Sequence, residues 1–260
     1  MIERIFPDAA VLSENDLDAE LLAVPAGAGS TPWVSFNFVS SLDGAATVDG
    51  LSGQLGNSVD QRIFTQLRHN AHVILVGAQT VRAEGYGGEL LSPQAQQWRT
   101  MNGLPAHPPL AIVSGTLNLD PALEVFTNAP VRPLILTLES APDGPRQALA
   151  QVADIITVGK DSLDVELLIA ELGAHGLHRI HSEGGPTLLG TFAAADKVDE
   201  LRLTVSPLLV GGPAGRIAHG IGGHLPRSMT LDSILKADSM LFLRYIRSAS
   251  STAEPPTTSP

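Results

Sequence analysis

The chain has 260 residues, of which 43% are hydrophobic, 17% charged and 4% aromatic, a composition that predicts one or two globular domains and excludes disordered or fibrous chains. Lys and Arg number 16 against 27 Asp and Glu, and the net charge of −11 argues against nucleic acid as a partner. Cysteine is absent, which excludes disulfides, zinc ribbons and thiol nucleophiles and fits a cytoplasmic protein.

The two ends of the chain differ from its middle. Residues 1–31 run into a stretch rich in Gly and Pro and are expected to form an N-terminal arm, with the domain covering residues 32–247. Residues 248–260 lack large apolar side chains and are expected to be a disordered tail. No signal peptide and no apolar run long enough to span a membrane is recognised, so no membrane partner is expected.

Between these ends, short β-rich runs alternate with helical patterns. This alternation predicts a three-layer α/β fold, a mostly parallel sheet with helices on both faces. The expected strands are residues 33–39, 73–77, 110–114, 134–138, 155–158, 179–182, 201–205 and 240–246. A Gly- and Pro-rich stretch with a weak helical pattern near Leu231 separates the last two, which predicts antiparallel strands at that edge.

Two helices are predicted with their caps. In residues 58–68, Ser58 and Gln61 fit a capping box, and apolar residues recur at helical spacing. In residues 163–172, the N-cap is expected at Asp161 or Ser162.

The most informative segment follows the run 179–182. Gly184 and Gly185 allow the backbone to approach a ligand, Pro186 suits the first position of a helix, and the free N–H groups of Thr187 and Leu188 attract phosphate. A diphosphate is the expected ligand, and a plain strand-to-helix turn is the alternative from these residues alone.

Two other strand ends carry candidate residues. Gly77 and Ala78 lead into a helical segment in which Thr80 would contact a phosphate or cap the helix. Asp43 lies beside Gly44 after the first strand, and its local chemistry is that of a turn former. Because the carboxyl end of this strand is expected at the same edge of the sheet as the other two strand ends, Asp43 is also a candidate for proton transfer. No metal-binding pattern of histidines is recognised, and no metal is expected.

Five motifs in order resemble the pyrimidine reductase family of riboflavin biosynthesis, which has a dihydrofolate-reductase-like fold. They are VSSLDG at 39–44, LR at 67–68, VGAQTVRAE at 76–84, SEGGP at 182–186 and SPLLVGG at 206–212. The resemblance covers about residues 32–246, and the variant at 80–87 is similar to stand-alone actinobacterial members. It implies a homodimer in which NADPH reduces the ribose of 5-amino-6-(5-phosphoribosylamino)uracil to ribityl.

The resemblance also assigns site residues. The cofactor is expected at Gly77, Ala78, Thr80, Glu84, Ser114, Gly184, Gly185, Pro186, Thr187 and Leu188, with Arg82 and Ser114 near the 2′-phosphate. The substrate is expected at Ser52, Arg68 and Glu183. As catalytic residues we expect Glu183 to orient the heterocycle and Asp43 or a water molecule to handle the proton.

One segment departs from the family pattern. Where members carry Asp-Asn-Pro or Asp-Asp-Pro and then an Arg for the substrate phosphate, residues 84–91 read EGYGGELL, without that Arg and with the acidic Glu89. The remaining Arg68 suits a phosphate or the carboxylate of a folate-like substrate equally. Two alternatives therefore stay open, a dihydrofolate or pteridine reductase and a non-catalytic NADPH-binding protein.

Overall fold

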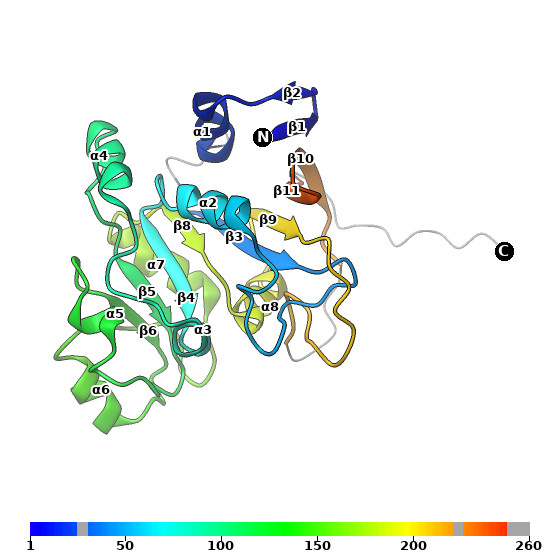
Figure 1. The fold of residues 1–260 in the computed structure, drawn as a ribbon. Coiled ribbons are helices and arrows are strands. Elements are labelled where there is room, and N and C mark those ends of the chain that lie inside the picture. Colours follow the sequence, from blue (N-terminus) through cyan, green and yellow to red (C-terminus); the bar gives the residue numbers. More distant parts are fainter. Residues whose placement is uncertain (25–30, 221–225, 249–260) are drawn as a thin grey trace.

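The computed structural model describes residues 1–24, 31–220 and 226–248. Their strands form one sheet in the order β2-β1-β10-β11-β9-β3-β8-β4-β5-β6-β7 (Figure 1). The strands are β1 Glu3–Phe6, β2 Ala10–Val11, β3 Trp33–Ser40, β4 Val73–Gly77, β5 Leu110–Val113, β6 Leu134–Thr137, β7 Asp154–Thr157, β8 Arg179–Ser182, β9 Glu200–Val205, β10 Met229–Ala237 and β11 Met240–Arg247. The helices are α1 Glu14–Leu22, α2 Ser58–Leu67, α3 Ala78–Glu84, α4 Pro93–Met101, α5 Glu124–Thr127, α6 Asp143–Leu149, α7 Val165–Ala174 and α8 Pro186–Ala194.

The sheet is parallel from β9 to β7 and antiparallel from β9 to β2. Each β-rich run predicted from the sequence is a strand, and the predicted three-layer α/β fold is confirmed. The β10–β11–β9 pairing also confirms the antiparallel prediction, although β11 lies inside the sheet because β10, β1 and β2 follow it. Among the described residues, the helices include none with the length and hydrophobicity of a transmembrane segment.

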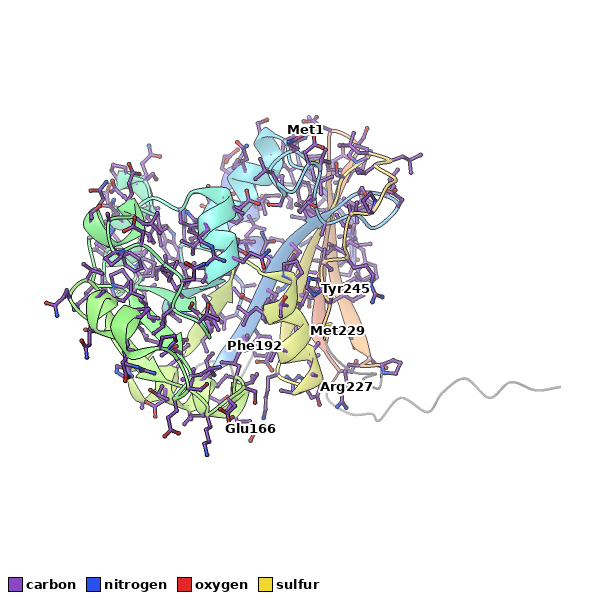
Figure 2. The ribbon with its side chains drawn as sticks, turned by 90° about the horizontal axis from the view of Figure 1, so that it is seen from below. Met1, Glu166, Phe192, Arg227, Met229 and Tyr245 are labelled. Carbon is purple, nitrogen blue, oxygen red and sulfur yellow. The ribbon has the colours of Figure 1, made fainter. Side chains whose placement is uncertain are left out.

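The central strands are apolar on both faces because helices cover both. In β4, Leu75 packs toward α7 and α8, including Phe192 of α8, which is labelled in Figure 2. Ile74 and Val76 pack on the other face with α3, α5 and α6. Such continuous apolar runs are typical of strands buried on both sides.

The N-terminal segment, expected to form an arm, is part of this fold. β1 pairs with β10, and Leu17 and Leu21 of α1 are buried against Ile63 and Leu67 of α2. Figure 1 shows α1 and α2 on the opposite side of the sheet from α8. Residues 25–30 of the Gly- and Pro-rich stretch and residues 249–260 of the expected tail lie outside the described residues.

The helix caps differ from those predicted. Asn57 caps α2, since its side chain accepts from the N–H groups of Val59 and Asp60 at 2.9 and 3.0 Å, and the capping box of Ser58 and Gln61 is wrong. Asp164 caps α7, which starts after both residues proposed for that role. Leu231 lies in strand β10, where Ser233, Leu235 and Ala237 are buried at a strand period of two.

Candidate active site

The carboxyl ends of β4 and β8 lie side by side at the centre of the sheet. The two strands pair in parallel, with Leu75 opposite Ser182. From β4 the chain passes through α3 toward β5, and from β8 it passes through α8 to β9 on the other side. Neighbouring parallel strands whose connections diverge leave a crevice in which α/β sheets bind ligands.

Glycines bring the two strand ends together. The Gly77 N–H donates to the Gly184 carbonyl at 3.2 Å. Gly185 has a φ of 101°, and a Cβ at this position would lie 3.5 Å from Leu188 Cβ and 3.6 Å from Thr80 Oγ1. A side chain at residue 185 would therefore strain the backbone and fill the space between the starts of α3 and α8.

Both helices begin without a side-chain cap. Gly77 precedes α3 and Gly185 precedes α8, and neither N-cap residue offers an acceptor to the first turn. Among the described residues, no side chain accepts from the N–H groups of Thr187 and Leu188, and N–H groups of this kind can bind an anion. Thr80 is the third residue of α3, so it does not cap that helix and its hydroxyl lies beside Gly185.

Arg68 and Glu183, both predicted to contact substrate, form an ion pair with each other. Arg68 Nε donates to Glu183 Oε1 at 2.5 Å and Nη2 donates to Oε2 at 2.7 Å. Tyr86 donates its hydroxyl hydrogen to the same Oε2 at 2.8 Å. The Glu183 side chain has 0% exposure and that of Arg68 has 13%, so Glu183 lies beneath its partners.

Other contacts hold the Arg68 side chain. Arg68 is the C-cap residue of α2, its Nη1 donates to the Leu90 carbonyl at 2.9 Å, and its guanidinium lies 4.6 Å from the centre of the Phe64 ring. Burial alone would lower the pKa of Arg68, but the charge and hydrogen bonds of Glu183 raise the pKa above its usual value.

The Arg68 guanidinium has five N–H groups, and three of them donate to Glu183 and to the Leu90 carbonyl. The other two have no acceptor among the described residues.

Asp43 is exposed and holds the loop that follows β9. Its carboxylate accepts from Ser41 Oγ at 2.5 Å and from the N–H groups of Val210 and Gly211 at 3.1 and 2.7 Å. The bond from Ser41 and those from the loop lower the pKa of Asp43 to about 2. Such a group is ionised at neutral pH and is a poor proton donor.

The other predicted contact residues are Ser52, Glu84, Ser114 and Arg82, and each makes a hydrogen bond within the protein. Ser52 donates to Glu84 Oε1 from its N–H at 3.0 Å and from its hydroxyl at 2.9 Å, so a residue expected at the substrate contacts one expected at the cofactor. The Ser114 hydroxyl accepts from the Leu117 N–H at 3.0 Å, and Arg82 donates to the Asn118 carbonyl at 2.8 Å. Ser114 and Arg82 therefore border the same turn after β5.

The sequence pattern gave no site role to Tyr86, Leu90 or Phe64. Tyr86 is one of two tyrosines in the chain and lies in the segment that departs from the family pattern. This departure from the family pattern is a sequence signal that marks Tyr86 as a candidate site residue. Leu90 contacts Arg68 through its backbone carbonyl, and Phe64 contacts it through the face of its ring. The residue types Leu and Phe do not predict either contact.

Comparison with known proteins identifies the family of the chain. The family described as the RibD C-terminal domain matches residues 32–243. The chain is 28% identical over 183 residues to a 2,5-diamino-6-ribosylamino-4(3H)-pyrimidinone 5′-phosphate reductase from Archaeoglobus fulgidus, a match that covers 70% of this chain and 83% of the relative. A reductase of the same name from Methanothermobacter thermautotrophicus is 28% identical over 210 residues, covering 77% and 94%. A solved pyrimidine reductase-like protein from Corynebacterium diphtheriae has a TM-score of 0.82 at 26% identity, covering 90% of this chain and 99% of that one.

Proposed function

The chain belongs to the RibD C-terminal domain family, and on that premise we propose that it uses NADPH to reduce the ribosyl group of a 6-ribosylaminopyrimidine 5′-phosphate to ribityl. The observation that carries the proposal is the crevice between β4 and β8. Two uncapped helix starts meet there through Gly77, Gly184 and Gly185. A diphosphate needs this combination of close backbone approach and free N–H groups.

The residues of the crevice fit the cofactor. The N–H groups of Thr187 and Leu188 would hold the diphosphate, with the Thr80 hydroxyl beside them. Arg82 and Ser114 border one turn and would contact the 2′-phosphate that distinguishes NADPH from NADH. Bound NADPH supplies the hydride, and the protein's part is to place the acceptor carbon beside it.

The substrate phosphate is assigned to Arg68. Two N–H groups of Arg68 have no acceptor among the described residues, and they would match the paired oxygens of a phosphate. Glu183 acts by fixing Arg68, because its carboxylate has no exposed surface and takes hydrogen bonds from Arg68 and Tyr86. Since the lowered pKa of Asp43 leaves it ionised, we assign the proton to water and give Asp43 the role of ordering the loop at Val210 and Gly211.

A direct assay tests the proposal. Consumption of NADPH is followed with 5-amino-6-(5-phosphoribosylamino)uracil, with its 2-amino counterpart and with dihydrofolate. We expect turnover of a ribosylaminopyrimidine phosphate and a preference for NADPH over NADH. Turnover of dihydrofolate alone would instead support a folate reductase, and NADPH binding without any turnover would support a binding protein.

A homodimer working in the cytoplasm is also part of the proposal. On the face of β9, β11 and β10 opposite α1 and α2, Leu243 pairs with Leu203 and Ile234 across the strands. These half-buried leucines and isoleucine belong to none of the core clusters of the described residues. Light scattering should report a dimer, and Leu243→Glu should shift it to a monomer. A wild-type monomer would contradict this assignment.

A further inference from the structure

Residues 85–91 form the loop that follows α3, and two groups of this loop contact the Arg68–Glu183 pair. The Tyr86 hydroxyl donates to Glu183 Oε2 at 2.8 Å, and the Leu90 carbonyl accepts from Arg68 Nη1 at 2.9 Å. One short loop therefore touches both members of the ion pair. It is also the loop that lacks the arginine which the family resemblance implies for the substrate phosphate.

Gly88 fixes the position of this loop. A Cβ added at Gly88 would lie 2.1 Å from the backbone carbon of Asn128 and 2.6 Å from the nitrogen of Ala129. These distances are far inside van der Waals contact, and both partners are backbone atoms. The loop thus approaches the end of α5 as closely as only glycine permits, and this packing places Tyr86 independently of the ion pair.

The chemistry of Tyr86 limits what it can do. Burial, and then the charge of Glu183, raises the pKa of Tyr86 well above its usual value, so the phenol keeps its proton and donates a hydrogen bond at any working pH. A phenol that holds its proton so strongly is a poor proton source for the reaction. The Glu183 side chain is fully buried, whereas Arg68 retains some exposure and has two N–H groups for which the described part of the chain offers no acceptor.

We propose that Tyr86 is a positioning residue which, through Glu183, fixes the Arg68 guanidinium in the orientation that receives the substrate phosphate. The inference rests on the proposed function and gives the loop that lacks a second phosphate-binding arginine an indirect role in phosphate binding. Tyr86 and Arg68 share Glu183 Oε2 as acceptor, so losing the hydroxyl frees the carboxylate to turn and Arg68 turns with it.

The test compares Tyr86→Phe with Tyr245→Phe, the same change at the other tyrosine of the chain. Steady-state kinetics are measured with the phosphorylated ribosylaminopyrimidine and with its dephosphorylated form. We expect Tyr86→Phe to raise KM for the phosphorylated substrate roughly tenfold, the ratio that corresponds to about 1.4 kcal/mol, with kcat nearly unchanged. KM for the dephosphorylated form and the Kd of NADPH should not move, and Tyr245→Phe should behave as wild type.

Calorimetry with ribose 5-phosphate separates this inference from the proposed function, because it needs no turnover. Weaker binding of ribose 5-phosphate to Tyr86→Phe than to wild type would support the inference even if no hydride transfer were seen. The inference would be overturned if ribose 5-phosphate bound both proteins equally well or did not bind wild type. It would also be overturned if KM rose equally for the phosphorylated and dephosphorylated substrates. Gly88→Ala, which displaces the loop by another route, should reproduce the selective loss, and wild-type affinity in that variant would contradict the role of the loop.

Discussion

Replacing Arg68 by Ala should destabilise the protein far more than an ordinary surface change. The substitution leaves the Glu183 carboxylate with 0% side-chain exposure and with Tyr86 as its remaining side-chain donor among the described residues. Removing one partner of a buried ion pair costs about 3–5 kcal/mol because the other charge stays buried and unpaired. For a chain of this size we expect the Tm to fall by roughly 6–20 °C, at about 2–4 °C per kcal/mol.

The matched control lies on the same helix. Arg62 of α2 pairs with Glu14, whose side chain is 78% exposed, and such surface pairs contribute about 0–1 kcal/mol. Thermal unfolding of Arg68→Ala, Arg62→Ala and the double variant Arg68→Met/Glu183→Gln decides the question. The double variant removes both charges, so it should regain at least half of the lost stability. If Arg68→Ala and Arg62→Ala lower the Tm equally, the reasoning about a buried pair is refuted.

Three further predictions concern the cofactor crevice, the loop at Asp43 and the N-terminal segment. Gly185→Asp should abolish NADPH binding in a fluorescence titration, because residue 185 has a φ of 101° and faces Thr80, whereas Gly144→Ala, in open space, should bind normally. The folded pKa of Asp43 is about 2 against 3.8, so its contribution to stability is complete above pH 3.8 and is lost as the pH falls through 2. The difference in unfolding free energy between wild type and Asp43→Asn should therefore shrink toward pH 2, and a constant difference would contradict the role of the charge. Leu21→Ala should cost about 2–5 kcal/mol in a urea titration, because Leu21 is 3% exposed on the buried face of α1, and a cost below about 0.5 kcal/mol would show that the segment does not pack.

The central parallel strands could be predicted from the sequence because they are apolar on both faces. Residues 73–76 have 0% exposure along their whole length, and a short continuous apolar run of this kind is typical of a buried parallel strand. The caps were harder to predict, since Asn57 and Ser58 are neighbours that both favour the position, and the choice depends on the backbone angle at Asn57.

The N-terminal segment was missed for a different reason. Leu17 and Leu21 have helical spacing, and Ser13 with Asp16 forms a capping box, but β1 and β2 together span only a few residues. Their place at the edge of the sheet depends on pairing with β10, more than two hundred positions away in the chain. Long-range pairing of this kind leaves no local signal.

The sequence predicted which residues belong to the candidate site but not how their side chains contact one another. Order along the chain brought Gly77, Thr80 and Gly185 to one rim, because the carboxyl ends of parallel strands share an edge. The pairing of Arg68 with Glu183 and the contribution of Tyr86 could not be predicted, since each depends on side-chain directions at the ends of α2, β8 and the loop 85–91.

Hydride transfer from labelled cofactor tests the central claim most directly. The protein is incubated with NADPH that carries deuterium on the transferred position of the nicotinamide ring and with the ribosylaminopyrimidine phosphate, and the product is analysed by mass spectrometry. The account predicts a ribityl product with one deuterium, bound to the carbon next to the amine nitrogen, and no such product from Gly185→Asp. Unchanged substrate under these conditions, with NADPH bound and the protein folded, would contradict the claim that this crevice carries out the reduction.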